Sequence, residues 1–186
     1  GAAILVDVPS ISGSTVRVDV NDGSSIEGGN GVIFDVRGGA VATMNVNRST
    51  LSGDIVSDSA SRTSVVLGNE AVLNGRMENV ANVTINETGQ WNVTGSSNVG
   101  SLEMNGGTVS MHSAGGFYQL NLDRLGGSGG NFELKTDFAT GETDSLNISG
   151  EASGKHQLVV ASSGKDPASG QTITLVHTGG GDAQFS

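Results

Sequence analysis

Three histidines, His112, His156 and His177, are the side chains of this sequence best suited to bind a transition metal. Each lies in or beside a stretch of alternating apolar residues, and about one sequence repeat separates His156 from His177. Stacking could align these two, but two imidazoles without a third ligand make a poor zinc site. We therefore expect the three histidines to face solvent.

The glycine-rich segment 126–132 resembles a calcium-binding nonapeptide. That motif needs aspartates repeated on successive turns, whereas this chain has one copy with Asn131 in an aspartate position. No helix is expected after these glycines, so they do not form a phosphate-binding loop. The segment is interpreted as a flexible turn, and no metal or cofactor is expected.

Several carboxylates could do acid–base chemistry, as in the parallel β-helices that cleave polysaccharides. They are Asp19, Asp22, Asp35, Asp54 and Asp58. None forms a close pair in sequence, aromatic residues are only 4% of the chain, and no Gly-x-Ser-x-Gly nucleophile motif occurs. The sequence favours a protein that is not an enzyme, with a polysaccharide-active enzyme as the remote alternative.

Composition and charge exclude further classes of function. The 186 residues include 30 Gly, 2 Pro and no Cys, and the net charge is −10. Nucleic acid and anionic lipid would be repelled by this charge. The lack of cysteine suits a chain that crosses a membrane unfolded. No stretch of ~20 apolar residues is present, and Gly1–Ala3 lacks the charged start of a signal peptide, so we expect the export signals to lie outside this sequence.

A near-repeat of about 18 to 22 residues indicates the architecture that must position these side chains. The segment 51–55 recurs as 73–77, and Leu73 recurs as Trp91 and then as Val109. The same spacing relates Phe34 to Ile55, Val46 to Leu67, Val65 to Val83 and Leu67 to Ile85. This period is typical of one coil of a β-solenoid, and it predicts roughly nine coils of about 20 residues.

Short alternating stretches predict the strands of these coils. Val16, Val18 and Val20 alternate with polar residues, and Asn21-Asp22-Gly23 then predicts a turn. No segment has a convincing helical period with caps. The fold class predicted from the residues is an all-β parallel solenoid.

The texture of the sequence, meaning the regularity of its repeat, changes over residues 98–115. This change divides one continuous domain into stem coils at 1–97 and C-terminal coils at 98–186. Strands are expected to be longer beyond this point, and their hairpin-like spacing after residue 116 predicts a cap for the open end. Phe34 is the only aromatic residue before Trp91. Because large rings bury more apolar area, the C-terminal half should be the more stable. Its predicted folding core and cap comprise Trp91, Phe117, Tyr118, Leu120, Leu122, Leu125, Phe132, Leu134, Leu146, Ile148, Leu158, Val160, Ile173 and Leu175.

Four segments of this half resemble the end of a pertactin-like passenger domain from a bacterial type V autotransporter. They are Phe117–Leu122, Leu125–Asp137, Asp144–Gly150 and Gly154–Val160. Glu142-Thr143-Asp144 departs from the Gly-Asp pair usual in that family. Residues 171–185 resemble the family's next coil.

The resemblance implies a right-handed parallel β-helix that ends in an autochaperone segment. Such a segment leaves the outer-membrane pore first, folds at the cell surface and templates the rest of the helix. The implied partners are the upstream passenger coils and the C-terminal translocator barrel of the same polypeptide. The implied function is therefore a folding and secretion module that supports an upstream virulence or adhesion region.

The alternative is a binding module, in which polar ladders on the N-terminal coils bind a host surface or a second copy of the protein. A host surface or cytoskeletal protein could also bind through other regions of the polypeptide. Five Asn residues match the N-glycosylation pattern, but in a bacterial protein we interpret them as turn and ladder residues. They are Asn47, Asn82, Asn86, Asn92 and Asn147.

Overall fold

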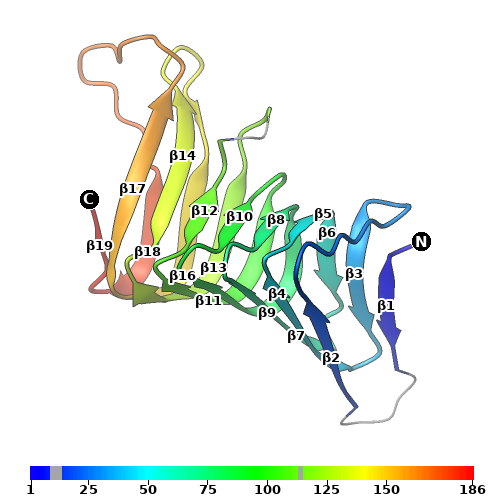
Figure 1. Cartoon of the computed structure of the whole chain (residues 1–186). Helices are drawn as coiled ribbons and strands as arrows, with labels where there is room; N and C mark the ends of the chain where they lie inside the picture. Colours follow the sequence, from blue (N-terminus) through cyan, green and yellow to red (C-terminus); the bar gives the residue numbers. More distant parts are fainter. Residues whose placement is uncertain (9–13, 113–114) are drawn as a thin grey trace.

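The computed structural model describes residues 1–8, 14–112 and 115–186, and Figure 1 shows them as a stack of coils that runs from one terminus to the other. Residues 113 and 114, at the end of the segment where the sequence texture changes, lie outside the described ranges. All regular elements of the described chain are β-strands. No helix in these ranges is long and apolar enough to cross a membrane. The predicted all-β parallel solenoid is confirmed.

The strands form two sheets that wind around a common interior. The first sheet contains β1 Ile4–Asp7, β2 Thr15–Val20, β3 Val32–Arg37, β4 Val41–Asn47, β6 Asp54–Ser57, β7 Arg62–Gly68, β9 Met77–Asn86, β11 Ser97–Asn105, β13 Gln119–Ser128, β16 Ser145–Ala152 and β18 Val176–Gly181. The second contains β5 Thr50–Ser52, β8 Val72–Asn74, β10 Gln90–Asn92, β12 Thr108–Ser110, β14 Asn131–Asp137, β15 Glu142–Thr143, β17 Lys155–Ser162 and β19 Gln184–Phe185. Every pairing between these strands is parallel except that of β14 with β15.

The sequence repeats are the lateral strand pairs of the structure. Leu51 pairs with Leu73, Leu73 with Trp91, and Trp91 with Val109. Val65 pairs with Val83, and Phe34 with Ile55. Because neighbouring strands lie about 4.8 Å apart, a residue can stack only on the residue one coil away. The period of the sequence is therefore the length of a coil.

Coil length is less uniform than the sequence suggested, and the expected number of about nine coils was too high. The central path of the first sheet runs through eight strands. Stacked residues lie 18 positions apart at Asn74 and Asn92, but 26 apart at Asn121 and Asn147. Because the coils near the ends are longer than the sequence period, the same number of residues forms fewer coils.

The interior is built from columns of apolar side chains, one from each coil. In the second sheet the column continues from Val109 to Phe132 and then to Leu158. In the first sheet Met44 stacks on Val65, and both are fully buried. Each coil thus covers the apolar face of the previous one, which a single coil could not bury by itself.

Trp91 is the largest fully buried side chain. The coil before it supplies the hydrogen-bond acceptor for the only polar atom of its ring. The indole Nε1–H of Trp91 donates a hydrogen bond to the Gly75 carbonyl at 2.9 Å. Gly75 lies in the turn after β8, where a Cβ atom would come within 2.0 Å of the Gly53 carbonyl oxygen. Only glycine permits this close stacking of successive turns.

Outward-facing asparagines form ladders along the stack. The side-chain amide of Asn69 donates to Asn47, and that of Asn47 to Asn21. Asn92 donates likewise to Asn74 at 2.7 Å, and Asn105 to Asn86 at 3.1 Å. These contacts confirm the interpretation of Asn47, Asn86 and Asn92 as ladder residues.

Two expectations for the C-terminal end differ from the structure. Ile173 and Leu175 are partly exposed and precede β18, where Val176 instead stacks on Leu146. The segment after residue 116 is not built mainly of hairpins, because β13, β14, β16, β17 and β18 continue the parallel ladders, and its role as a cap stays a prediction. Its hairpin, β14–β15, pairs Thr136 with Thr143, and only β15 lies off the path of stacked strands. The alternation is the same in a hairpin and in a coil, so it could not distinguish them.

We expect Trp91→Phe to lower the free energy of unfolding by about 1–3 kcal/mol, because it leaves the buried Gly75 carbonyl without a donor. Trp91→Ala should cost about 3–5 kcal/mol through the cavity that it creates. Urea denaturation measures both, with Leu5→Ala as an exposed control expected within about 0.5 kcal/mol of the parent. A Trp91→Phe variant as stable as the parent would contradict the role given to the indole hydrogen bond.

Candidate functional site

The three histidines do not form a common site. His156 lies in β17 and stacks on Phe185, whereas His177 lies in the other sheet, paired with Asn147. His112 is half-buried, with its Nε2 3.0 Å from the Leu134 carbonyl oxygen. Among the residues that the structure describes, no cluster of three His, Cys, Asp or Glu side chains could hold a metal ion.

The expectation that His156 faces solvent was wrong. Its side chain is only 3% exposed and packs edge-on to Phe132, with ring centroids 5.7 Å apart. The Phe185 ring lies 5.8 Å away, and the His156 Nε2 is 2.8 Å from the Ser153 carbonyl oxygen. The imidazole therefore takes an aromatic place in the interior column, which alternation alone does not reveal for an amphipathic residue.

The aspartates considered for acid–base chemistry are engaged separately. Four of them contact an arginine: Asp19 with Arg17, Asp22 with Arg48, Asp35 with Arg37, and Asp54 with Arg76. Asp58 instead accepts hydrogen bonds from the backbone N–H groups of Gly38, Ala60 and Ser61. The Ser61 hydroxyl and these amides hold the pKa of Asp58 below its usual range. None of these contacts brings two of the carboxylates together as an acid–base pair.

The glycine-rich segment forms the end of β13 and the turn into β14. Gly127 and Gly129 have φ angles of 77° and 73°, which glycine adopts without strain. A Cβ at Gly127 would approach the Met104 carbonyl oxygen to 2.1 Å. Close stacking of this turn on the coil before it explains these glycines without a bound cation.

The structure buries eight of the fourteen residues predicted as the folding core and cap, while their role in folding stays a prediction. These eight are Trp91, Leu120, Leu122, Leu125, Phe132, Leu134, Leu146 and Ile148. Leu120 stacks on Leu146, and Leu122 on Ile148, across β13 and β16. The buried residues of β13, β14 and β16 together form a continuous apolar wall.

The other six lie at the margin of this wall, which corrects their placement in the core. Besides Ile173 and Leu175, Phe117 and Tyr118 are partly exposed, and Val160 is 42% exposed. Leu158 and Val160 stack on Phe132 and Leu134, but β19 pairs only with Lys155 and His156. The inward faces of Leu158 and Val160 thus have a neighbouring coil on one side only.

A buried ion pair, which sequence reasoning did not single out, connects the segments of this region. The carboxylate of Asp144 is fully buried and accepts backbone N–H groups of Tyr118 at 2.8 Å and Lys135 at 2.9 Å. The Lys135 Nζ lies 3.1 Å from both carboxylate oxygens and donates to the Met111 carbonyl at 2.7 Å. We call this group of Met111, Tyr118, Lys135 and Asp144 the polar clasp.

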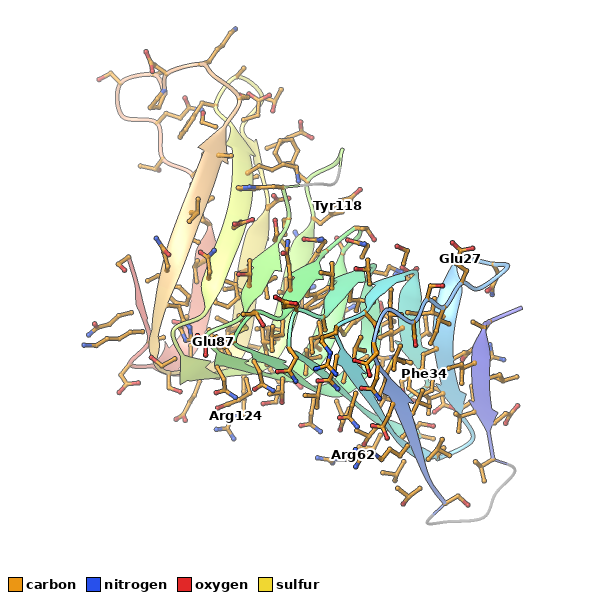
Figure 2. All side chains as sticks on the ribbon, in the orientation of Figure 1. Glu27, Phe34, Arg62, Glu87, Tyr118 and Arg124 are labelled. Atoms are coloured by element: carbon orange, nitrogen blue, oxygen red, sulfur yellow. The ribbon has the colours of Figure 1, made fainter. Side chains whose placement is uncertain are left out.

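Two aromatic rings cover the charged end of Lys135. Its Nζ lies 5.3 Å from the ring centroid of Phe117 and 5.6 Å from that of Tyr118, within the range of cation–π attraction. Figure 2 shows Tyr118 on the opposite side of the stack from Arg62 and Arg124. The partly exposed rings of Phe117 and Tyr118 thus cover the charge of Lys135 and do not pack in the core.

The hairpin between β14 and β15 positions the carboxylate of the clasp. Gly141, with a φ angle of 78°, ends the turn after β14, and Thr143 then pairs with Thr136. This brings Asp144 back beside Lys135. In the sequence, alternation places Lys135 among outward polar residues, and only the irregular Glu142-Thr143-Asp144 segment marked the position as unusual.

Comparison with known proteins agrees with this arrangement of coils. The pertactin family model matches residues 99–186. Over its whole length the chain is similar to the BrkA autotransporter of Bordetella pertussis, at 31% identity across 20% of that protein. The autotransporter adhesin/invasin TibA of Escherichia coli is 32% identical over 84% of the chain and 16% of its own length.

The pertactin autotransporter of Bordetella parapertussis is 37% identical over 64% of the chain and 13% of its own length. The chain thus spans a fifth or less of each of these three relatives. The stacked parallel coils, the family match and these similarities show that the chain belongs to the pertactin-like passenger domains of bacterial autotransporters.

Proposed function

We propose that this chain is a folding and secretion module, whose C-terminal coils nucleate the β-helix and support a region farther upstream. Proteins of the autotransporter class are delivered through the outer membrane to the bacterial cell surface, and in them passenger and translocator are one polypeptide. The implied partners are the preceding coils of the passenger and the translocator of the same chain. We propose no catalytic activity for this part of the protein.

The observation that carries the proposal is the change in strand length along the second sheet. Strands β5, β8, β10 and β12 have 3 residues each, whereas β14 has 7 and β17 has 8. The pair β14–β17 accordingly spans positions from Asn131↔Gln157 to Thr136↔Ser162. Within the second sheet, this longer pairing adds backbone hydrogen bonds between two coils. It favours a unit that can form before its neighbours, because nucleation is limited by the entropy of closing the first coil.

The polar clasp adds a second stabilising contact within the same unit. It joins the end of the coil at Met111 to β14 and to the start of β16 through one carboxylate and one ammonium group. A charge pair this deeply buried requires all its partners at once, so it favours one arrangement of the segments over near alternatives. Such a unit could template the shorter strands upstream.

A second candidate function is binding to a host surface or to another copy through the exposed faces of the coils. The outward asparagine ladders favour it, because they present regularly spaced polar groups along the stack. This function would occupy a different part of the chain from the nucleating unit.

We expect deletion of residues 98–186 from the autotransporter that contains this chain to abolish folded passenger at the cell surface. Antibody labelling and protease resistance of intact cells measure this, and segment 98–186 supplied from outside should restore resistance. The matched control is deletion of residues 51–90, which removes two coils in register because Leu51, Leu73 and Trp91 share one column. The control should keep its display. Normal display without residues 98–186, or equal loss in both deletions, would contradict the proposal.

The clasp predicts a characteristic response to substitution. Asp144→Asn leaves the Lys135 ammonium buried without a counter-charge, and should lower the free energy of unfolding by about 3–5 kcal/mol. The double variant Lys135→Met with Asp144→Asn should regain part of this loss, because the unpaired charge is gone. Denaturation of the single and double variants measures the coupling. A single variant within about 0.5 kcal/mol of the parent would show that the clasp does not stabilise these coils.

A further inference from the structure

A groove of about 630 Å³, lined by both polar and apolar residues, runs along the outside of the first sheet across several successive coils. It passes Ala81 in β9, Gly100 in β11 and Asp123 in β13, close to the positions where the pairings β9–β11 and β13–β16 shift in register. One wall is the ladder of Asn98, Asn121 and Asn147. This groove lies apart from the clasp and from the aromatic cluster of the last coils.

The ladder orders the amide groups of this wall. Asn147 donates to the Oδ1 of Asn121 at 3.0 Å, and Asn121 donates to the Oδ1 of Asn98 at 3.0 Å. Asn98 in turn donates to a carboxylate oxygen of Glu78 at 3.0 Å. A side-chain amide has two N–H donors and an oxygen with two lone pairs. Asn98 and Asn121 therefore each keep one donor and one acceptor for a ligand, held in a fixed orientation.

Small residues line the base of the groove, so no large side chain covers the backbone there. A Cβ atom at Gly100 would meet the Ala81 carbonyl oxygen at 2.5 Å, so stacking requires glycine there. Ser149 continues this line two coils farther on, in β16, and is exposed. A ligand can thus approach the ladder along several coils without a large side chain in its way.

The chemistry of the lining narrows the class of ligand. It contains no Lys or Arg, which excludes the phosphate contacts that nucleic acid needs. Of its two carboxylates, Asp58 is already occupied by the N–H groups of a turn, which leaves Asp123 as a weak attraction for cations. Amides and hydroxyls dominate the remaining polar groups, and these pair best with neutral groups that both donate and accept.

We propose that this groove binds an extended, uncharged oligosaccharide whose successive hydroxyl groups pair with the ladder of Asn98, Asn121 and Asn147. The amides recur with the coil spacing of about 4.8 Å, so a linear polymer can repeat the same contact from coil to coil. This binding goes beyond the proposed role in folding and does not depend on it. With no aromatic ring in the lining to stack on a sugar, binding would rest on hydrogen bonds and be weak.

The test is a nuclear magnetic resonance titration of the isotope-labelled 186-residue chain with three hexasaccharides. Chitohexaose is neutral and extended, maltohexaose is neutral and coiled, and hexagalacturonate is acidic. We expect saturable shifts of the Asn98 and Asn121 side-chain amides with chitohexaose, and none with hexagalacturonate, which the net charge of −10 repels. No saturable shift with chitohexaose, or tighter binding of maltohexaose or hexagalacturonate, would overturn the proposal.

Two variants and one control locate the binding. Asn121→Ala should weaken chitohexaose binding roughly tenfold, the effect of losing one or two hydrogen bonds. Ser149→Trp should block the groove while leaving the ladder intact, so it tests the site even if Asn121→Ala fails to fold. Asn92→Ala interrupts an equivalent ladder with Asn74 outside the groove and should bind as the parent does. Unchanged binding by a folded Ser149→Trp, or equal loss in Asn92→Ala, would overturn the assignment to the groove.

Discussion

The stacking distance between coils is the constraint on which the rest of the structure depends. At about 4.8 Å per coil, every inward side chain must be followed by one that packs on it, and every turn must lie against a similar turn. The column from Leu51 through Trp91 to Phe132 meets the first requirement. Gly75, which lies against Gly53, meets the second. Asparagine ladders are the polar equivalent on the outer face.

This constraint explains which features could be predicted from the sequence. Stacked residues must be similar, so offsets such as Leu73 to Trp91 were visible as repeats and became strand pairs. The fold class followed from that similarity. Coil length and the position of Ile173 could not be predicted from this similarity, because loops of any length can connect strands that stack in this way.

The candidate site was less predictable because it rests on exceptions to the pattern. His156 takes an aromatic place in the interior, and Lys135 turns from an outward position toward the buried Asp144. Both depend on contacts between segments far apart in sequence, which alternation in a single strand does not encode. The groove beside Asn121 likewise exists only once the coils are stacked.

The central claim is that the C-terminal coils, which hold the longest strands of the second sheet, fold before the rest of the β-helix. Pulsed hydrogen exchange during refolding of the 186-residue chain tests it most directly. The account predicts that amides of β14, β16 and β17 become protected before those of β4 and β7. Simultaneous protection of both groups, or earlier protection of β4 and β7, would contradict it.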